Sequence, residues 1–306
     1  MHALVAAADP PHVAIAEVPE PQPLPFEALV DARAFSLNRG EVKALAGATP
    51  GGVHGWDVAG VVAQAAADGS GPPAGTRVVG LKYPPGAWAQ RAAIPTDALA
   101  ALPDGVTFEQ AATLPVAGMT ALRAFEVCGL LLGKRVAVTG ASGGVGRFAV
   151  QLARLSGAHV TAVARHPEGL TELGADAVVP YLAPEGDGFD AILDGVGGPT
   201  LGAAIQRIAP AGTVVSYAST VSEPVEYPTR ALFGQSPGAK VYGLLIFPEL
   251  QRTRSATSDL TRLAGLIAAG RLRVDVSHTA SWRDAPRIVR ALLDGEVRGK
   301  AVLTLD

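Results

Sequence analysis

The sequence has few of the residues on which several classes of protein depend. Its one cysteine, Cys128, can form neither an intramolecular disulfide nor a multi-thiolate zinc site. Charged residues make up 17% of the 306 residues, the formal net charge is −3, and no block of like charge occurs. A nucleic acid or an anionic membrane would require a basic field, which this composition lacks. No stretch approaches the roughly 18 uninterrupted apolar residues that indicate a transmembrane helix.

Apolar residues, in contrast, make up 48% of the chain, which is enough to build packed cores and excludes a largely disordered protein. The length of the chain predicts about two domains. The N-terminal stretch has no Lys or Arg before its apolar run, and that run stops after a few residues, so we interpret it as a first strand rather than a signal peptide. These features predict a soluble, cytoplasmic protein.

The chain changes character near residue 109. Before this point, short runs rich in Val and Ala are interrupted by Pro or Gly every few residues, as in Pro10-Pro11, Gly51-Gly52 and Pro84-Pro85-Gly86. Closely spaced short strands with such punctuation predict a compact β-rich domain. After this point, strand-like and helix-like segments alternate, which predicts an α/β domain with a parallel sheet and helices on both faces.

The alternating half begins with a strand at residues 135–139, followed by a helix at 146–156 whose apolar side chains have helical spacing. Further strands are expected at residues 159–164, 175–179, 189–194, 212–217 and 240–246. A long helix near 258–269 should end at Gly270. The tail should then hold strands at 271–276 and 300–305 around a helix near 282–293.

A glycine-rich turn, Gly140-Ala-Ser-Gly143-Gly144-Val-Gly146, lies between the first strand and the first helix of the alternating half. Glycines let the chain turn tightly and let its backbone approach a pyrophosphate, while the helix start offers free N–H groups and the positive end of its dipole. Ala141 stands where G-x-G-x-x-G has its first glycine. Such a turn can be purely structural, but its strand–turn–helix context favours dinucleotide binding.

The end of the second strand indicates which dinucleotide binds. NAD sites usually place Asp or Glu about 20 residues further on to bind the ribose 2′-hydroxyl, whereas NADP sites place Arg nearby. Here the strand ends Val163-Ala164-Arg165-His166, without a carboxylate. Arg165 can pair bidentately with a 2′-phosphate, and His166 can assist it. A solvated loop arginine is the alternative, but the position favours NADPH.

Five motifs occur in order along the chain. They are Ser36-Leu-Asn-Arg-Gly-Glu41, Gly55-Trp-Asp57-Val-Ala-Gly60-Val-Val, Leu114-Pro-Val-Ala-Gly-Met-Thr120-Ala121, residues 141–146 and Gly299-Lys300-Ala-Val-Leu. Together they resemble the medium-chain dehydrogenase/reductase superfamily, in its zinc-independent quinone oxidoreductase (zeta-crystallin-like) branch, over essentially the whole chain. This resemblance implies a GroES-like β-rich catalytic domain at residues 1–112 and 271–306 and a Rossmann doubly wound domain at 113–270. It also implies a homodimer joined at the edge strand 240–246, whose exposed edge would invite pairing.

The resemblance also implies which residues contact the cofactor. Asn38 and Thr120 should face the nicotinamide half, residues 142–146 should cradle the pyrophosphate, and Arg298 and Lys300 should close the site. The full set of expected NADPH contacts is Asn38, Thr120, Ala141, Ser142, Gly143, Gly144, Val145, Gly146, Arg165, His166, Asp194, Val196, Ser216, Leu244, Ile246, Arg298 and Lys300. Asn38 could instead cap a turn and Thr120 could instead pack a helix start, and Asp57 is expected to be structural.

The expected catalytic set is Asn38, Lys43 and Thr120. Some relatives that reduce enones or enoyl thioesters carry a Tyr in the loop after the Asn motif, and Lys43 and Thr49 occupy those positions here. Lys43 is therefore a candidate proton donor, with Lys82, Tyr83 and water as alternatives.

No metal site is expected. Zinc-dependent relatives have a Cys and a Gly-His-Glu motif, where this chain reads Gly55-Trp-Asp57, and its six histidines show no i, i+4 pair. Cys128 is expected to be a buried, apolar-like residue rather than a nucleophile.

The sequence therefore predicts an NADPH-dependent oxidoreductase that reduces a quinone or a carbonyl-conjugated C=C bond (enone, alkenal or enoyl) by hydride transfer. The alternatives are a zinc-independent, NADPH-dependent ketone or alcohol oxidoreductase and a non-catalytic NADPH-binding redox sensor.

Overall fold

The computed structural model describes residues 1–305, which form two compact units. Unit 1 consists of residues 1–119 together with the segment from Leu250 onward, and unit 2 consists of residues 120–249. This division differs from the sequence-based boundaries at 112/113 and 270/271. The difference arises largely from α7 (Ala256–Ala268), which packs in unit 1, where Thr257 Oγ1 donates to the carbonyl of Thr96 at 3.2 Å.

Unit 2 contains a six-stranded sheet in which all neighbouring strands are parallel. In spatial order the strands are β10 (Ala177–Val179), β9 (His159–Val163), β8 (Arg135–Thr139), β11 (Phe189–Asp194), β12 (Ile208–Ser216) and β13 (Lys240–Gly243). This is the 3-2-1-4-5-6 order of a doubly wound dinucleotide-binding fold. The chain adds β9 and β10 on one side of β8 and then β11, β12 and β13 on the other side, so the topological switch point lies at the carboxyl ends of β8 and β11.

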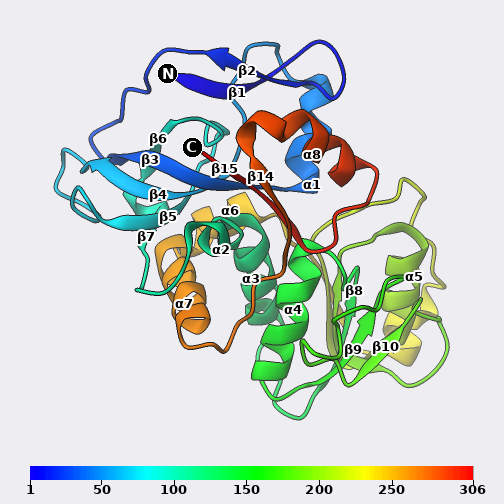
Figure 1. Ribbon diagram of the computed structural model, residues 1–306. Coiled ribbons are helices and arrows are strands. Elements are labelled where there is room, and N and C mark those ends of the chain that lie inside the picture. Colours follow the sequence, from blue (N-terminus) through cyan, green and yellow to red (C-terminus); the bar gives the residue numbers. More distant parts are fainter. Residues whose placement is uncertain (306) are drawn as a thin grey trace. The chain divides into compact units, whose positions relative to one another are not determined.

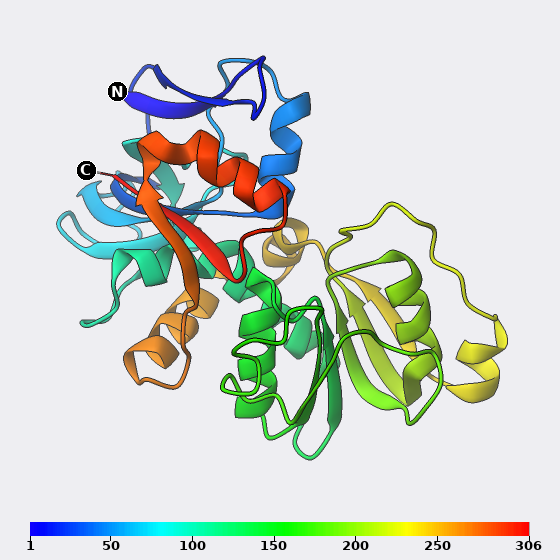
Figure 2. The same cartoon turned by 45° about the vertical axis from the view of Figure 1, so that its right-hand side comes forward.

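The central strands of unit 2 are largely apolar because both faces of the sheet are covered there. Residues 136–138 of β8 are all fully buried, as expected for a parallel strand between two helical layers. The helices α4 (Gly144–Leu155) and α5 (Gly198–Arg207) lie on opposite faces (Figures 1 and 2). Unit 2 also contains a π-helical turn at Ala231–Gln235, almost all of α3 (Met119–Cys128) and the first half of α6 (Ile246–Thr253). The predicted α/β fold class is confirmed.

Unit 1 contains a sheet of seven strands that is antiparallel except for one parallel pair at its edge, formed by the two strands nearest the C-terminus. The order is β14 (Val276–Ser281), β15 (Lys300–Thr304), β3 (Glu27–Leu37), β4 (Asp57–Gln64), β5 (Arg77–Leu81) and β7 (Leu99–Ala101), and β6 (Arg91–Pro95) also pairs with β3. The strands β1 (His2–Ala6) and β2 (Val13–Glu17) form a separate antiparallel pair. In this sheet β15, from late in the chain, lies between β14 and β3.

Helices and short turns cover the sheet of unit 1. They are α1 (Arg39–Ala44), α2 (Phe108–Ala112), the π-helical turn η3 (Leu114–Gly118), α7 and α8 (Ala285–Leu293), with 3-10 turns at Leu45–Gly47, Thr96–Ala98 and Trp282–Asp284. One core cluster joins Phe35, Trp88, Trp282, Ile288 and Leu303, each at most 3% exposed. Its members come from both ends of the chain, so the N-terminal and C-terminal segments share one core.

Two glycines of the Gly55-to-Gly60 motif are required by close packing. A Cβ on Gly55, whose φ is +97°, would lie 2.1 Å from Cδ1 of Trp88, and a Cβ on Gly60 would lie 2.1 Å from the carbonyl oxygen of Asp31. Neither distance is possible for real atoms, so larger residues are excluded at both positions. This packing fixes the start of β4, and with it Asp57.

Several predicted elements have shifted bounds. The strands β8 and β11 have the predicted ends, but β13 ends at Gly243 because α6 begins at Ile246. The strand expected at 271–276 is wrong: β14 occupies Val276–Ser281 instead, because the N–H groups of Arg271 and Leu272 donate to the carbonyl of Leu266 and continue the end of α7. Within residues 1–305, no helix combines the length and apolarity that crossing a bilayer would need.

Candidate functional site

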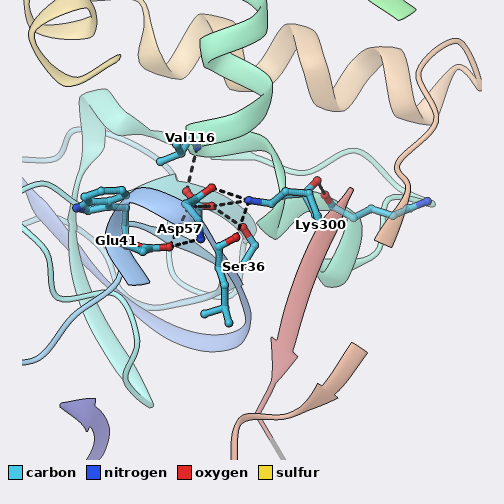
Figure 3. A network of polar contacts seen from close by, with 10 residues as sticks. Ser36, Glu41, Asp57, Val116 and Lys300 are labelled. Carbon is cyan, nitrogen blue, oxygen red and sulfur yellow. Dashed lines mark hydrogen bonds and ion pairs between the residues drawn. The ribbon is translucent and has the colours of Figure 1, made fainter. Parts of the chain in front are cut away.

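A cluster of polar side chains lies in unit 1 where β3, α1, β4 and β15 meet (Figure 3). We call it the Asp57 cluster, and its members are Ser36, Asn38, Glu41, Asp57 and Lys300. All except Asn38, which is half-buried, are at most 4% exposed. Buried charges are stable only when they are paired and hydrogen-bonded, so the contacts of each member decide what the cluster can do.

Asp57 is at the centre of the cluster, and both of its carboxylate oxygens accept hydrogen bonds. Its Oδ2 accepts a hydrogen bond from Ser36 Oγ at 2.5 Å and from Asn38 Nδ2 at 2.8 Å. Its Oδ1 accepts from the backbone N–H of Val116, in η3, at 3.0 Å. The ammonium of Lys300 lies 3.7 Å from Oδ2. Asp57 thus joins four segments of unit 1, which is what a structural carboxylate does.

Glu41 is the second buried carboxyl group of the cluster. Its Oε1 accepts from the backbone N–H of Asn38 at 2.7 Å and from Asn38 Nδ2 at 3.0 Å, and its Oε2 accepts from the N–H of Trp56 at 3.1 Å. Burial raises the pKa of Glu41 well above 4.5, and the charge of Asp57 acts in the same direction; Lys300 and the Asn38 hydrogen bonds oppose this shift.

Lys300 supplies the positive charge within the cluster. Its Nζ donates to Asn38 Oδ1 at 2.6 Å and to the carbonyl of Leu37 at 3.2 Å. Burial lowers the pKa of Lys300, while the charges of Asp57 and Glu41 raise it. Through these bonds Lys300 holds the end of β3 to β15. A contact between Lys300 and the cofactor remains a prediction.

The contacts of Asn38 limit its chemistry. Both hydrogens of Nδ2 are donated, to Glu41 and Asp57, and Oδ1 accepts from Lys300. An amide nitrogen carries two hydrogens, so Asn38 has no side-chain donor left. Asn38 also stands immediately before α1, as the turn-capping alternative proposed. A contact between Asn38 and a cofactor remains a prediction.

The other expected residues of unit 1 are not part of the cluster. Lys43 is exposed on α1, and Arg298 is exposed before β15. Of the alternative proton donors, Lys82 donates to Glu27 at 2.8 Å, and Tyr83 is 49% exposed. Thr120, the first residue of unit 2, is 5% exposed at the start of α3.

In unit 2, the glycine-rich turn joins β8 to α4 as the motif predicts. Gly143 is the N-cap of α4 and has no side chain to accept from the helix N–H groups, and the first turn contains no acidic residue. A Cβ on Gly146 would lie 2.4 Å from the carbonyl oxygen of Gly140, so only glycine allows this close approach of helix and loop. Ala141, in the place of the first motif glycine, is fully buried and donates its N–H to Val163 at 3.2 Å. The loop therefore fits a pyrophosphate, whose oxygens would accept from the uncapped N–H groups.

The carboxyl ends of β8 and β11 are tied together at the switch point. Thr139 Oγ1 donates to Asp194 Oδ1 at 2.6 Å and accepts from the N–H of Gly195 at 3.2 Å. Asp194 also accepts from the N–H groups of Val196 at 3.4 Å and Gly197 at 3.0 Å. Burial raises the pKa of Asp194, and these hydrogen bonds oppose the shift. Asp194, expected as a cofactor contact, is completely buried and shapes the loop that carries Val196.

The remaining expected contacts lie at the carboxyl ends of the other strands. Arg165 and His166 are exposed in the loop after β9, and no carboxylate lies between Val163 and Pro167. Ser216 ends β12 and accepts the N–H of Leu244 at 2.8 Å. Leu244 and Ile246 are each 4% exposed. These residues lie at the edge of the sheet where doubly wound folds bind their ligands.

Sequence reasoning missed three residues near these loops. Thr139 is the last residue of β8, directly before the glycine motif, and Arg147 directly follows this motif. Tyr217 follows β12, and its hydroxyl oxygen lies 2.7 Å from the position that a Cβ on Gly195 would take. Burial raises the pKa of Tyr217, and the charge of Asp194 adds to this. Thr139 and Arg147 could have been found from the sequence, because each is directly adjacent to the glycine motif. No sequence feature indicated Tyr217.

Comparisons with known proteins agree with this fold. A family model described as zinc-binding dehydrogenase matches residues 173–303. A chloroplast envelope quinone oxidoreductase homolog of Arabidopsis thaliana is 39% identical over 187 residues, covering 56% of this chain and 57% of that protein. A trans-enoyl reductase of Aspergillus terreus is 32% identical over 210 residues, covering 60% of this chain and 69% of that protein. The chain thus spans little more than half the length of the Arabidopsis relative.

Solved structures are similar over the whole chain. A quinone oxidoreductase from Coxiella burnetii is 26% identical, with a TM-score of 0.85 over 100% of this chain and 99% of that one. A mycobacterial protein complexed with NADPH is 25% identical, with a TM-score of 0.87 over 99% of this chain and 100% of that one.

The zinc ion named in the family description does not fit the residues present. No group of three His, Cys, Asp or Glu side chains in residues 1–305 could hold a metal ion. Asp57 stands within the stretch that matches Gly-His-Glu. Its carboxylate already accepts hydrogen bonds from Ser36, Asn38 and Val116 and pairs with the ammonium of Lys300. With its doubly wound sheet, its glycine-rich loop and its relatives, the chain belongs to the medium-chain dehydrogenase/reductase superfamily, among the members that resemble quinone oxidoreductases.

Proposed function

We propose that this protein is an NADPH-dependent oxidoreductase that transfers hydride to a quinone or to a C=C bond conjugated with a carbonyl group. The observation that carries the proposal is the uncapped N-terminus of α4 behind the glycine-rich loop, together with an exposed Arg165 and no carboxylate directly after β9. The quinone oxidoreductase and trans-enoyl reductase relatives support the two acceptor classes, and the neighbour complexed with NADPH supports the cofactor.

The residues of unit 2 would bind and orient the cofactor. The N–H groups of Gly144, Val145 and Gly146 would donate to the pyrophosphate, and Arg165 would pair with the 2′-phosphate. The link from Thr139 to Asp194 holds the two strand ends of the switch point in one arrangement. Such a preformed site reduces the entropy lost when cofactor and acceptor are brought together. Bound NADPH supplies the hydride.

The proton that completes the reduction comes from solvent in this proposal. Hydride adds to the β-carbon of an enone or to a quinone, and a proton from water then reaches the α-carbon or the oxygen. Lys82 donates to Glu27, and Lys43 is exposed on α1, outside the Asp57 cluster. Location in the cytoplasm remains a prediction.

A panel of acceptors tests the activity. The loss of NADPH absorbance should be measured with quinones, alkenals, enoyl thioesters and ketones, with NADPH binding measured separately by calorimetry. Steady oxidation with a quinone or conjugated acceptor supports the proposal. Oxidation with ketones alone would identify a carbonyl reductase instead, and binding without any turnover would identify an NADPH sensor.

The cofactor preference is tested at Arg165. A hydrogen bond between charged groups contributes about 1.5–3 kcal/mol, so NADPH should bind roughly ten- to a hundredfold more tightly than NADH. Arg165→Asp should reverse this preference, because a carboxylate repels the 2′-phosphate and accepts from the 2′-hydroxyl. Equal affinity of the unaltered protein for both cofactors would contradict the assignment.

A further inference from the structure

Arg147 lies where the glycine-rich loop meets α4, a position that ordinarily disfavours a cation. It is the fourth residue after the N-cap Gly143, and its N–H donates to the carbonyl of Gly143 at 3.0 Å. Side chains on a helix point back toward its N-terminus, so the guanidinium lies at the positive end of the helix dipole. A cation placed there is unfavourable for helix stability, which suggests that Arg147 serves another purpose.

The guanidinium of Arg147 connects two loops that neighbour each other at the carboxyl edge of the sheet. Its Nη2 donates to the carbonyl of Glu168 at 2.8 Å, and its Nε lies 3.4 Å from the carbonyl of Ser142. Ser142 belongs to the glycine-rich loop, and Glu168 belongs to the loop after β9. A planar guanidinium can reach both carbonyls at once because its N–H groups are fixed in a fork.

The loop after β9 is built to accept this contact. Gly169 has a φ of +78°, and a Cβ there would lie 3.3 Å from Nη1 of Arg147, so glycine permits the close approach. Residues 165–168 are all exposed and lie outside helices and strands. The segment that contains Arg165 and His166 therefore has little packing of its own. The hydrogen bond from the Arg147 side chain to Glu168 connects this segment to the rest of unit 2.

We propose that Arg147 is a positioning residue for cofactor specificity, which holds the loop after β9 against the glycine-rich loop so that Arg165 is preordered to bind a 2′-phosphate. The inference rests on the proposed NADPH dependence and deepens it. Ordering a free side chain and its loop on binding reduces affinity, and a loop ordered beforehand avoids this loss. Arg147 thus acts on the 2′-phosphate through Arg165.

The test uses two nucleotides that differ mainly in the 2′-phosphate: adenosine 2′,5′-bisphosphate and adenosine 5′-monophosphate. Their binding is measured by calorimetry, which needs no turnover. Arg147→Met should weaken binding of the bisphosphate by roughly three- to tenfold, the effect of one lost ordering contact, and binding of the monophosphate by less than about twofold. Arg147→Lys should behave like Arg147→Met, because an ammonium cannot replace the fork.

A double-mutant cycle separates positioning from direct contact. If Arg147 acts through Arg165, then Arg147→Met should add little to the loss already caused by Arg165→Met. Arg154→Met is the matched control, because Arg154 is an exposed arginine on the same helix that also contacts a residue beyond β9, Asp176 at 3.3 Å, but at the other end of α4. It should leave the binding of both nucleotides unchanged. Thermal unfolding of each variant checks that it is folded.

The outcomes distinguish this inference from the proposed function. If the unaltered protein does not prefer the bisphosphate, the NADPH preference and the role of Arg147 both fail. If it does prefer the bisphosphate but Arg147→Met keeps that preference, only the role of Arg147 fails. An equal loss for both nucleotides would show that Arg147 supports the glycine-rich loop in general. Full affinity in Arg147→Lys would show that the charge alone matters, and independent effects in the double variant would show that Arg147 contacts the 2′-phosphate directly. Each of these results overturns the positioning role.

Discussion

Removal of the Lys300 ammonium tests whether charge holds the Asp57 cluster together. Lys300 is 4% exposed, and its Nζ lies 3.7 Å from Asp57 Oδ2. The variant Lys300→Met would leave the two carboxyl groups, Glu41 and Asp57, without the cluster's cation. Removing one partner of a buried ion pair costs about 3–5 kcal/mol, and we expect the free energy of unfolding to fall by this amount near pH 8.

The loss should shrink as the pH falls. Burial and Asp57 already raise the pKa of Glu41 above 4.5, and Lys300→Met removes a group that opposes this shift. A carboxyl group whose pKa is raised by folding contributes stability below its unfolded pKa and loses that contribution as the pH rises through its folded pKa. Each pH unit in this window changes the stability by up to about 1.4 kcal/mol for one proton. The penalty near pH 5 should therefore be at least about 1 kcal/mol smaller than near pH 8.

Urea unfolding followed by tryptophan fluorescence measures this effect in the correct part of the chain. All three tryptophans, Trp56, Trp88 and Trp282, belong to unit 1, as does the Asp57 cluster. The exposed Lys43 provides the control, since Lys43→Met should change the stability by less than about 0.5 kcal/mol.

A second variant separates charge from packing. Glu41→Gln combined with Lys300→Met restores the formal charge of the cluster, and it should recover part of the lost stability. A loss below about 1 kcal/mol in Lys300→Met near pH 8, or an equal loss at both pH values, would refute the reasoning.

Three further predictions concern other parts of the chain. Burial raises the pKa of the Cys128 thiol to about 12, so a disulfide reagent near pH 8 should react slowly with the native protein and quickly after denaturation; fast native reaction would contradict this. The strand β13 is the edge of its sheet and exposes Val241 at 47%, so we predict a homodimer joined there, and light scattering that gives a 31.1 kDa particle would argue against it. Lys43→Met should reduce turnover by less than about tenfold, whereas Asn38→Ala should reduce it more, because its loss removes partners of Glu41, Asp57 and Lys300. If Lys43→Met abolishes turnover while NADPH still binds, Lys43 is the proton donor.

Much of the parallel sheet could be predicted from the sequence because its strands are short apolar runs. The bounds of β8 and β11 agree because each is a strand with a continuous buried run, flanked by turn residues. In contrast, β14 (Val-Ser-His-Thr-Ala-Ser) is a half-buried edge strand with a weak apolar pattern, and only its pairing with β15 makes it a strand. Local propensity cannot reveal a strand of this kind, because tertiary pairing determines it.

The candidate site was predictable where it depends on local sequence and not where it depends on distant contacts. The glycine-rich loop and Arg165 follow from spacing along one strand–turn–helix unit. The role of Asn38 depends on Lys300, which is 262 positions away in sequence, and on the orientation of its amide between two carboxyl groups. No motif encodes which hydrogen-bonding groups a neighbour will use, so the sequence could name Asn38 but could not show that both of its amide hydrogens are already donated.

The place of β15 in the sheet of unit 1 has a consequence for the order in which the protein folds during synthesis. Residues 34–37 of β3 pair with β15, and Asp57 meets Lys300, yet β15 is translated only after all of unit 2. Unit 2 is continuous in sequence and can fold as soon as it leaves the ribosome. Until β15 arrives, however, the early strands of unit 1 carry an open edge and an unpaired buried carboxylate. The N-terminal part of unit 1, although it is synthesised first, therefore keeps its open strand edge and its buried polar groups exposed for the longest time during synthesis.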